Sequence, residues 1–306
     1  MDLHRLGLVS TRAQHFQLVA RLGSIRAAAR AVNLAPSSVS RSLRSLEEDL
    51  RAPLFERMQQ RLRLTSAGEL LLYHIQQSSA ELGRAVTEIG DLQGLRRGTV
   101  TLAVIESAAR GLLPEVLAGF WIRNPEITVA VTVGGSTDMA AMVAGAEADI
   151  ALAFDVRVPR NARRLAAASL PMGVVVPPGS RLAKLETLRI YDLAGERVIL
   201  SDASLTLGTS VEEAFGRAGV DFARRARTNS IGLMIDLARR GLGTILQTRL
   251  GLEREIAQGD LAFLPVTDSR LAPRRLVLIG RAKGEMSEAA GSLADSLARA
   301  VDRLAP

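Results

Sequence analysis

Apolar residues in the first fifty positions recur at helical spacing and are interrupted twice. Gly23 ends the first helical pattern, and Ser24 can cap a second helix that runs to about Val32. A turn at 33–35 follows. Pro36 suits the first position of a third helix, because its missing N–H would be unpaired there anyway. The positions expected to face inward are Phe16, Val19 and Ala20 in the first helix and Val39, Leu43 and Leu46 in the third.

The third helix and the residues after it complete a predicted N-terminal module, residues 1–65. This helix runs to about Asp49, and Pro53 stops any continuation. The segment RLRLT, residues 61–65, alternates in polarity as a strand does, which predicts a small wing. Helix, tight turn and helix is the layout of a helix-turn-helix, whose second helix enters the major groove of DNA. An ordinary helical hairpin is the alternative.

Residues 66 to about 93 predict one long helix without proline. Apolar or small residues in it alternate spacings of three and four, as in the a/d seam of a coiled coil. The seam consists of Ile75, Ser78, Leu82, Ala85, Ile89 and Leu92. We expect dimerisation through the three large residues Ile75, Leu82 and Ile89. The serine and the alanine weaken the seam, and a surface helix packed on its own domain is the alternative. Residues 66–97 would form this helix and a hinge.

From residue 99 onward, strand and helix patterns alternate. The segment at 99–105 is nearly all apolar, as expected of a strand covered on both faces. A helix at 112–125, a strand at 127–133, a further helix and a strand at 148–154 complete a βαβαβ pattern with short connections. This pattern predicts a right-handed parallel sheet.

Residues 165–265 repeat this alternation, and a strand at 274–282 and a final helix close the chain. We therefore expect an α/β domain over residues 98–306 made of two lobes with a cleft between them. Lobe I would contain about residues 98–162 and 267–306, and lobe II about residues 163–266.

Charge is distributed unevenly along the chain. Residues 1–66 contain eleven arginines and five acidic residues, a net charge of +6, whereas the whole chain of 306 residues carries +7. Such asymmetry indicates a basic module that binds a polyanion, attached to a nearly neutral body. A general preference for arginine explains which cation is used, since the chain has only Lys184 and Lys283. It does not explain why the cations cluster.

Several classes of function are disfavoured by the composition and motifs. The chain has no cysteine, which excludes disulfides, cysteine zinc sites and thiol nucleophiles. Its start lacks the apolar region of a signal peptide, and its longest charge-free apolar run is broken by prolines, so we expect a cytoplasmic protein. No nucleophile elbow or phosphate-binding loop is present. No histidine follows His74; His4 and His15 can contact DNA phosphate instead. We expect no enzyme activity, no cofactor and no metal.

Four N-terminal motifs identify a family. Residues 16–29 read FQLVARLGSIRAAA, residues 39–47 VSRSLRSLE, residues 53–57 PLFER and residues 62–68 LRLTSAG. These motifs resemble those of the LysR-type transcriptional regulators. The segments LLPEVLAGFWIRNPEITV, AEADIALAF and ARRGLGTILQ follow in the order that the family shows. The resemblance spans essentially the whole chain. It implies an all-α winged helix-turn-helix with a long linker helix, followed by a two-lobed α/β domain like that of type 2 periplasmic binding proteins.

The expected DNA-binding residues lie in the helix-turn-helix and the wing. Serines at a helix N-terminus can donate to phosphate or to base edges, and arginine can contact guanine or phosphate. The candidates are Ser24, Arg26, Pro36, Ser37, Ser38, Ser40, Arg41, Arg44, Arg57, Arg61 and Arg63.

Three positions depart from the family pattern. Pro36 stands where the family often has glutamine, which leaves base preference open. Arg51 stands where it usually has glycine, which predicts a weaker helix cap and a possible phosphate contact. Gln60 replaces a basic wing residue, for which Arg61 and Arg63 can substitute.

Ligands of two-lobed sheets bind beyond the carboxyl ends of strands, and the resemblance places effector contacts in the same loops. The candidates are Glu106, Ser107, Ser136, Thr137, Ser204, Leu205, Thr228 and Asn229. Hydroxyl groups at helix N-termini can donate to a carboxylate, although each can equally be only a helix cap. Glu106 and Asp138 at the cleft suggest an amine-bearing effector, such as an amino acid.

The sequence thus predicts a sequence-specific transcriptional regulator whose contacts with double-stranded promoter DNA change when a small molecule binds between two lobes. We expect a homodimer or a dimer of dimers, and no membrane association. A solute-binding protein would share the two lobes, but the basic first 65 residues and the missing signal peptide argue against it. An enzyme would need a nucleophile and a base in the cleft. The effector, the target genes and the sign of regulation are left open.

Overall fold

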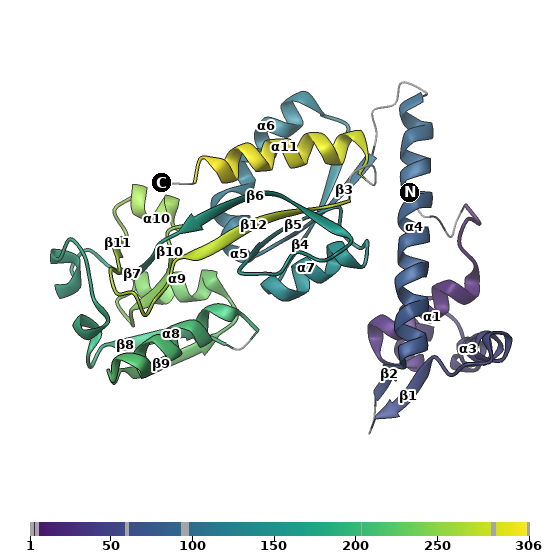
Figure 1. The fold of residues 1–306 in the computed structure, drawn as a ribbon, viewed down its shortest axis with the longest axis horizontal. Helices are drawn as coiled ribbons and strands as arrows, with labels where there is room; N and C mark the ends of the chain where they lie inside the picture. The colour runs from purple at the N-terminus through teal and green to yellow at the C-terminus, as the bar shows by residue number, and fades with distance from the viewer. Residues whose placement is uncertain are drawn as a thin grey trace. The chain divides into compact units, whose positions relative to one another are not determined.

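The computed structural model describes residues 3, 6–58, 61–92, 98–202, 204–282 and 286–304. The chain forms two compact units, a first built from residues 1–95 and a second that holds nearly all of residues 96–306 (Figure 1). Each unit has its own hydrophobic core, as expected of separate domains.

Three helices, a two-stranded wing and a long helix make up the first unit. They are α1 (Thr11–Leu22), α2 (Ile25–Ala31), α3 (Pro36–Leu50), β1 (Phe55–Met58), β2 (Arg61–Leu64) and α4 (Ser66–Leu92). The two strands pair antiparallel. The buried core consists of Phe16, Val19, Ala28, Ala29, Val39, Leu43 and Leu54. The predicted helix-turn-helix, its wing and most of its inward-facing positions are confirmed.

Helix ends in the first unit follow simple capping chemistry. Gly23 ends α1 with a φ of 64°. The Ser24 hydroxyl accepts a hydrogen bond from the Ala27 N–H at 3.4 Å and begins α2. Pro36 is the first residue of α3. Arg51 ends α3 with a φ of 52°, a conformation that glycine adopts at lower cost, as the comparison with the family pattern predicted.

Two polar side chains fix the wing between α3 and α4. Glu47 Oε1 accepts a hydrogen bond from the Leu54 N–H at 2.7 Å. The Thr65 hydroxyl donates to the Pro53 carbonyl at 2.7 Å and accepts from the Gly68 N–H at 3.1 Å. A Cβ on Gly68 would lie 2.2 Å from the Leu54 carbonyl oxygen, so this close approach requires glycine. These contacts give a structural reason for several of the motif residues.

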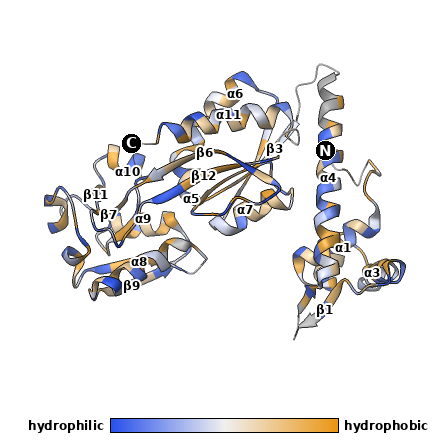
Figure 2. Ribbon diagram, viewed as in Figure 1, coloured by the Kyte–Doolittle hydropathy of each residue, from blue (hydrophilic) through white to orange (hydrophobic). Residues whose placement is uncertain are grey.

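The long helix α4 covers the predicted span almost residue for residue. Figure 2 shows both hydrophobic and hydrophilic residues along it. Ile75 of the predicted seam is half-buried and packs against the core of its own unit. Ile89 is 56% exposed. The part of the seam near Ile89 is therefore more available to a second copy than the part near Ile75.

The second unit begins with a five-stranded sheet in the order β4-β3-β5-β12-β6. Its strands are β3 (Gly98–Val104), β4 (Ile127–Val133), β5 (Ile150–Phe154), β6 (Ala162–Leu170) and β12 (Arg274–Arg281). β3 pairs parallel with β4 and β5, as predicted. β12 pairs antiparallel with both β5 and β6. The expected parallel sheet is therefore a mixed one, because the chain returns to it from the second lobe.

Helices cover both faces of this sheet, which defines lobe I (Figure 1). On one face lie α5 (Glu106–Gly111), α6 (Leu113–Arg123) and α11 (Glu288–Asp302), and on the other lies α7 (Ser136–Ala144). Alternate residues of β3 face opposite sides: Leu102 packs under α5 and α6, whereas Ala103 packs under α7. Glu106 and Ser107 thus belong to a short helix rather than to the loop that the sequence predicted.

Lobe II has its own sheet and core. Its central strand β7 (Met172–Val176) pairs antiparallel with β10 (Ile245–Thr248) and β11 (Ala262–Pro265), and β8 (Arg197–Ser201) pairs parallel with β9 (Ala223–Thr228). The remaining elements are η1 (Arg181–Lys184), η2 (Ile190–Leu193), α8 (Thr206–Ala218), α9 (Ile231–Arg239) and α10 (Glu253–Ala257). Apolar residues of α8 and α9 pack with those of β7, β8 and β10 in one core.

The change from lobe I to lobe II lies later than predicted. The sequence predicts the boundary at residue 163, but β6 runs to Leu170 and pairs with β12 in the sheet of lobe I. Lobe II therefore begins near Pro171. The sequence 162–170 carries both arginines and alanines, so it showed no clear strand pattern of its own.

Among the described residues, no helix combines the length and the apolar character needed to cross a membrane.

Candidate functional site

The first unit exposes the polar side of α3. Pro36, Ser37, Arg41 and Arg44 are exposed, and Ser38 and Ser40 are half-buried. Within the part of the chain that the structure describes, the Arg41 and Arg44 side chains form no hydrogen bond or ion pair. Ala35, which precedes the helix, offers no side-chain oxygen to the N–H groups of the first turn. Pro36 has no N–H, and the Ser38 N–H donates to the Ala35 carbonyl at 3.0 Å. The exposed side of α3 therefore offers an anionic partner mainly its arginines and the Ser37 hydroxyl.

The other predicted DNA-binding residues differ in their surroundings. Arg26 on α2 and Arg63 on β2 are exposed, whereas Ser24 uses its hydroxyl as a helix cap. The side chains of Arg57 and Arg61, like residues His4 and Gln60, lie outside the described residues.

The expectation that His15 contacts phosphate is wrong. Its side chain is 5% exposed and faces the core of the first unit, where burial lowers the pKa of the imidazole.

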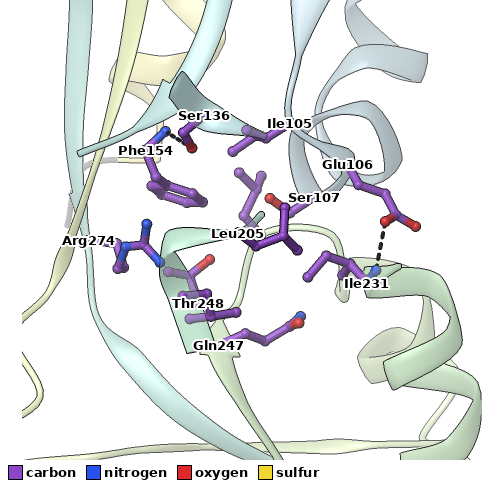
Figure 3. Close-up of a pocket in the computed structure, with 12 residues that line it drawn as sticks. Ile105, Glu106, Ser107, Ser136, Phe154, Leu205, Ile231, Gln247, Thr248 and Arg274 are labelled. Atoms are coloured by element: carbon purple, nitrogen blue, oxygen red, sulfur yellow. Dashed lines mark hydrogen bonds between the residues drawn. The ribbon is translucent and has the colours of Figure 1, made fainter. Parts of the chain in front are cut away.

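A small pocket in the second unit lies between the two lobes and is partly open to solvent (Figure 3). Lobe I contributes Ile105, Glu106, Ser107, Ser136, Phe154 and Arg274. Lobe II contributes Leu205, Leu207, Ile231, Gln247, Thr248 and Leu250. Half of these residues are aliphatic or aromatic, so the pocket combines an apolar body with a few polar groups, as small-molecule sites commonly do.

The pocket contains four of the predicted effector residues: Glu106, Ser107, Ser136 and Leu205. The other four lie outside its lining. Thr137, Ser204 and Asn229 are exposed, and the Ser204 hydroxyl donates to Asp202 Oδ1 at 2.6 Å. The Thr228 hydroxyl accepts from the Ser230 N–H at 3.2 Å and so shapes the turn before α9.

Glu106 connects the two lobes. Its carboxylate accepts hydrogen bonds from the N–H groups of Ile231 at 2.6 Å and Gly232 at 2.8 Å, at the N-terminus of α9 (Figure 3). The Ser230 hydroxyl lies 3.4 Å from the same carboxylate. A carboxylate is stabilised at such a helix end by the free N–H groups and the helix dipole. Glu106 therefore has partners within the protein, which removes the reason for expecting an amine on the effector; Asp138, the second acid, is exposed outside the lining.

One turn further along α5, Arg110 makes a second connection. Its guanidinium donates to Glu255 Oε1 at 2.7 Å, and its Nε lies 3.5 Å from the Gly251 carbonyl oxygen. Nearby, Glu253 accepts from the Gly251 N–H at 2.9 Å, and burial raises the pKa of its carboxyl group. Two charged side chains of one short helix thus bind lobe II.

The guanidinium of Arg274 is also paired. This residue, 6% exposed, donates through Nε to the Asp155 carboxylate, and its guanidinium carbon lies 5.0 Å from the centre of the Phe154 ring. The Ser136 hydroxyl accepts from the Phe154 N–H at 3.1 Å. These contacts fix one wall of the pocket.

Gln247 is the residue that sequence reasoning missed most clearly. It is 3% exposed, and neither its amide nitrogen nor its amide oxygen has a hydrogen-bond partner among the described residues. Figure 3 shows its side chain reaching from β10 toward the side of the pocket where Ile231 lies. A sequence signal existed, because this glutamine directly follows the apolar pair Ile245 and Leu246 of a buried strand.

A helix-turn-helix whose third helix exposes two arginines, joined to two lobes around a pocket, defines a DNA-binding regulator with a ligand-binding domain. Comparison with known families agrees. The model of the bacterial regulatory helix-turn-helix protein, lysR family, matches residues 11–69, and that of the LysR substrate binding domain matches residues 93–302. The chain belongs to the LysR family of transcriptional regulators, which are DNA-binding proteins with an effector-binding domain and not enzymes.

Individual relatives cover nearly the whole chain. It is 29% identical to the HTH-type transcriptional regulator CbbR of Xanthobacter flavus over 288 residues, which are 90% of this chain and 86% of that protein. A variant of full-length OxyR from Pseudomonas aeruginosa superposes with a TM-score of 0.65 at 17% identity, covering 94% of this chain and 93% of that one. Full-length CbnR in complex with its target DNA gives 0.61 at 19% identity, covering 98% and 100%. These two structures support the fold.

Proposed function

We propose that this regulator binds promoter DNA as a homodimer, with α3 in the major groove, and that a small molecule between the lobes changes its DNA contacts. The observation that carries the DNA-binding site is the pair of exposed arginines, Arg41 and Arg44, which have no partner in the described part of the chain. They lie one turn apart, so both can face the same groove. The proposed place of action is the cytoplasm.

Different residues of α3 would have different roles. Ser37 would bind phosphate at the helix N-terminus through its hydroxyl. Arg41 would contact a base edge, because it lies one turn further into the helix. Arg26 and Arg63 would add phosphate contacts on either side. Pro36 has no N–H and a short apolar side chain, so it would contribute only apolar contact at the leading position.

Exposed apolar residues support self-association. Ile89 on α4 is 56% exposed, and on the second unit Ile122 is 83% and Val133 51% exposed. β4, which carries Val133, is an edge strand of its sheet. Edge strands and apolar surface of this kind usually need a partner. We propose that a second copy covers them, and that a dimer of dimers uses both surfaces.

Effector action would follow from the position of the pocket. Its lining comes equally from the two lobes, so a molecule that contacts both stabilises the arrangement in which they are close. A ligand shifts such an equilibrium by its difference in affinity for the two arrangements. The altered arrangement would change how a dimer presents its two α3 helices to DNA.

A DNA-binding titration tests this function. The full chain is titrated against its own upstream DNA and a scrambled fragment at several salt concentrations. We expect tighter binding to the upstream DNA and a steep loss of affinity with salt. Arg41→Ala should weaken specific binding by about 1–3 kcal/mol if Arg41 contacts a base. Arg240→Ala, an exposed arginine of lobe II, is the charge-matched control.

If Arg41→Ala lowers the affinity for both DNA fragments equally, Arg41 contacts phosphate and not a base. Failure of the wild-type chain to bind any promoter fragment would contradict the proposed function.

A further inference from the structure

We propose that the pocket between the lobes takes an uncharged, compact small molecule that carries an amide-like group, and that Gln247 recognises this group. The inference rests on the proposed function only for the role of that molecule as the effector. Two observations indicate the chemistry of the ligand. The amide of Gln247 has no hydrogen-bond partner among the described residues, and the charged side chains of Glu106 and Arg274 are paired within the protein.

The first observation is the state of Gln247. It lies at the third position of β10 (Ile245–Thr248), a strand whose residues are all buried. Both polar atoms of its side chain are inaccessible and without a partner in the described chain. Burial of an unbonded amide costs free energy that an apolar side chain of similar size would not cost. An amide of this kind in the lining of a pocket indicates a ligand that forms hydrogen bonds with it.

The chemistry of a side-chain amide defines what bonds it best. It presents an N–H donor and a carbonyl acceptor side by side. The complementary group offers an acceptor and a donor at the same spacing, as a primary carboxamide, a lactam or another cyclic amide does. A carboxylate only accepts, and an ammonium only donates, so each would leave one atom of Gln247 unbonded. The buried glutamine therefore discriminates against both ions.

The second observation is that the charged residues of the lining are already paired. The carboxylate of Glu106 accepts from the N–H groups of Ile231 and Gly232, and the guanidinium of Arg274 binds Asp155. The N-terminus of α9 is an anion site by geometry, but Glu106 fills it from within the protein. A charged ligand would have to leave water without gaining a free counterion, which is unfavourable. The pocket is thus adapted to an uncharged molecule.

The other residues of the lining indicate the character of the rest of the ligand. Ile105, Phe154, Leu205, Leu207, Ile231 and Leu250 are all apolar. They come from both lobes, so an apolar body of modest size would contact both while its amide reaches Gln247. The hydroxyl groups of Ser107 and Thr248 are in the same lining and offer secondary hydrogen bonds.

The experiment uses three matched probes, benzamide, benzoate and benzylamine, which share a ring and differ only in the polar group. Binding to the full chain is measured by calorimetry and by the shift of the thermal midpoint. We expect benzamide to bind at least about tenfold more tightly than the other two. Gln247→Met should abolish this preference. Gln258→Met, at the exposed glutamine that caps the end of α10, should leave it unchanged.

A second readout does not depend on the probes. Without any ligand, Gln247→Met should unfold at a higher temperature than the wild type, by about 2–4 °C, because the unbonded amide is removed. A lower midpoint would show that the amide is bonded within the protein and would overturn the proposal.

The proposal is also overturned if benzoate or benzylamine binds more tightly than benzamide, if benzamide does not bind at millimolar concentration, or if Gln247→Met binds it as the wild type does. A titration of promoter DNA on the same samples separates this outcome from a failure of the proposed function. Loss of DNA binding in the wild type would contradict that function, whereas the probe measurements concern the pocket alone.

Discussion

The exposed side of α3 in the first unit and the pocket in the second unit differ in whether their charged residues are paired. On α3, Arg41 and Arg44 are exposed and without partners in the described chain. In the pocket, Glu106 and Arg274 are each bound by groups of the same unit. Unpaired cations on a surface suit a polyanion, whose binding is strong and salt-dependent. Paired charges around a buried neutral amide suit a compact uncharged ligand, whose binding should depend little on salt.

The largest expected effect concerns the two arginines together. Arg41→Ala combined with Arg44→Ala should weaken binding to the upstream DNA by about 2–4 kcal/mol, since each contributes a base or phosphate contact. The dependence of affinity on salt should become shallower. Fluorescence anisotropy from about 50 to 200 mM salt measures both quantities. An unchanged salt slope would show that neither arginine neutralises phosphate, and an unchanged affinity would remove α3 from the interface.

The next effect tests the pairing in the pocket. Glu106→Gln should lower the stability of the second unit by about 1–2 kcal/mol, because a charge-assisted contact with the N-terminus of α9 is lost. It should also leave this helix end open to anions, so benzoate binding should increase. Denaturant unfolding and calorimetry check the two parts. Glu115→Gln, at an exposed glutamate on α6, is the matched control. Equal stabilities for the two variants would mean that Glu106 does not hold the lobes together.

A smaller effect is expected at Arg51, where two substitutions distinguish its effect on stability from its contact with DNA. Arg51 has a φ of 52°, so Arg51→Gly should stabilise the first unit by about 0.5–1 kcal/mol. The same change should weaken DNA binding slightly if Arg51 contacts phosphate. Arg51→Ala removes the charge but keeps the strained backbone, so it should weaken binding without the gain in stability. A gain in stability from the alanine variant would contradict the assignment of strain to this residue.

Two titratable groups with shifted pKa values give the smallest effects, and these effects have opposite signs in the two units. Burial lowers the pKa of His15 from its ordinary value of 6.5. The stability of the first unit should be constant above pH 6.5 and should fall as the pH drops from 6.5 toward the folded-state pKa. Unfolding of the wild type and of His15→Leu at pH 7.5 and 5.5 checks this. The variant should show no such fall between the two pH values.

In the second unit, burial raises the pKa of Glu253 above its ordinary value of 4.5. Its contribution to stability is therefore fully present below pH 4.5 and is lost as the pH rises through the folded-state value. Glu253→Gln should raise the thermal midpoint at pH 7, by less than about 2 °C, and should have no such effect near pH 4. A destabilised variant at pH 7 would show that the charged form is needed for its contact with the Gly251 N–H.

The two regions also differ in how far the sequence predicts them. In the first unit, Gly23, Ser24 and Pro36 act through local rules of helix capping, and the inward positions follow helical periodicity. The structure places the caps and most of the inward positions as predicted. His15 is an exception. The sequence leaves open whether it lies on the surface, where it can contact phosphate, or packs inside, and the structure buries it.

The pocket was predictable only in part. Ser107, Ser136 and Leu205 follow strands that are recognisable in the sequence. They were predicted because ligands bind beyond the carboxyl ends of such strands. Glu106 was also found, but its partners, Ile231 and Gly232, lie more than a hundred residues further along the chain. Pairing of this kind depends on the order of strands and on the closeness of the lobes, which local patterns do not specify. For the same reason, the mixed sheet and the assignment of β6 to lobe I were missed.

The most direct test of the account links the two regions. The affinity of the full chain for its upstream DNA is measured with and without saturating benzamide, for the wild type and for Gln247→Met. Because binding free energies at two coupled sites are reciprocal, an effector that shifts the lobes must change the affinity for DNA. We expect a severalfold change in the wild type and none in the variant. Identical DNA affinity with and without benzamide in the wild type would contradict the account.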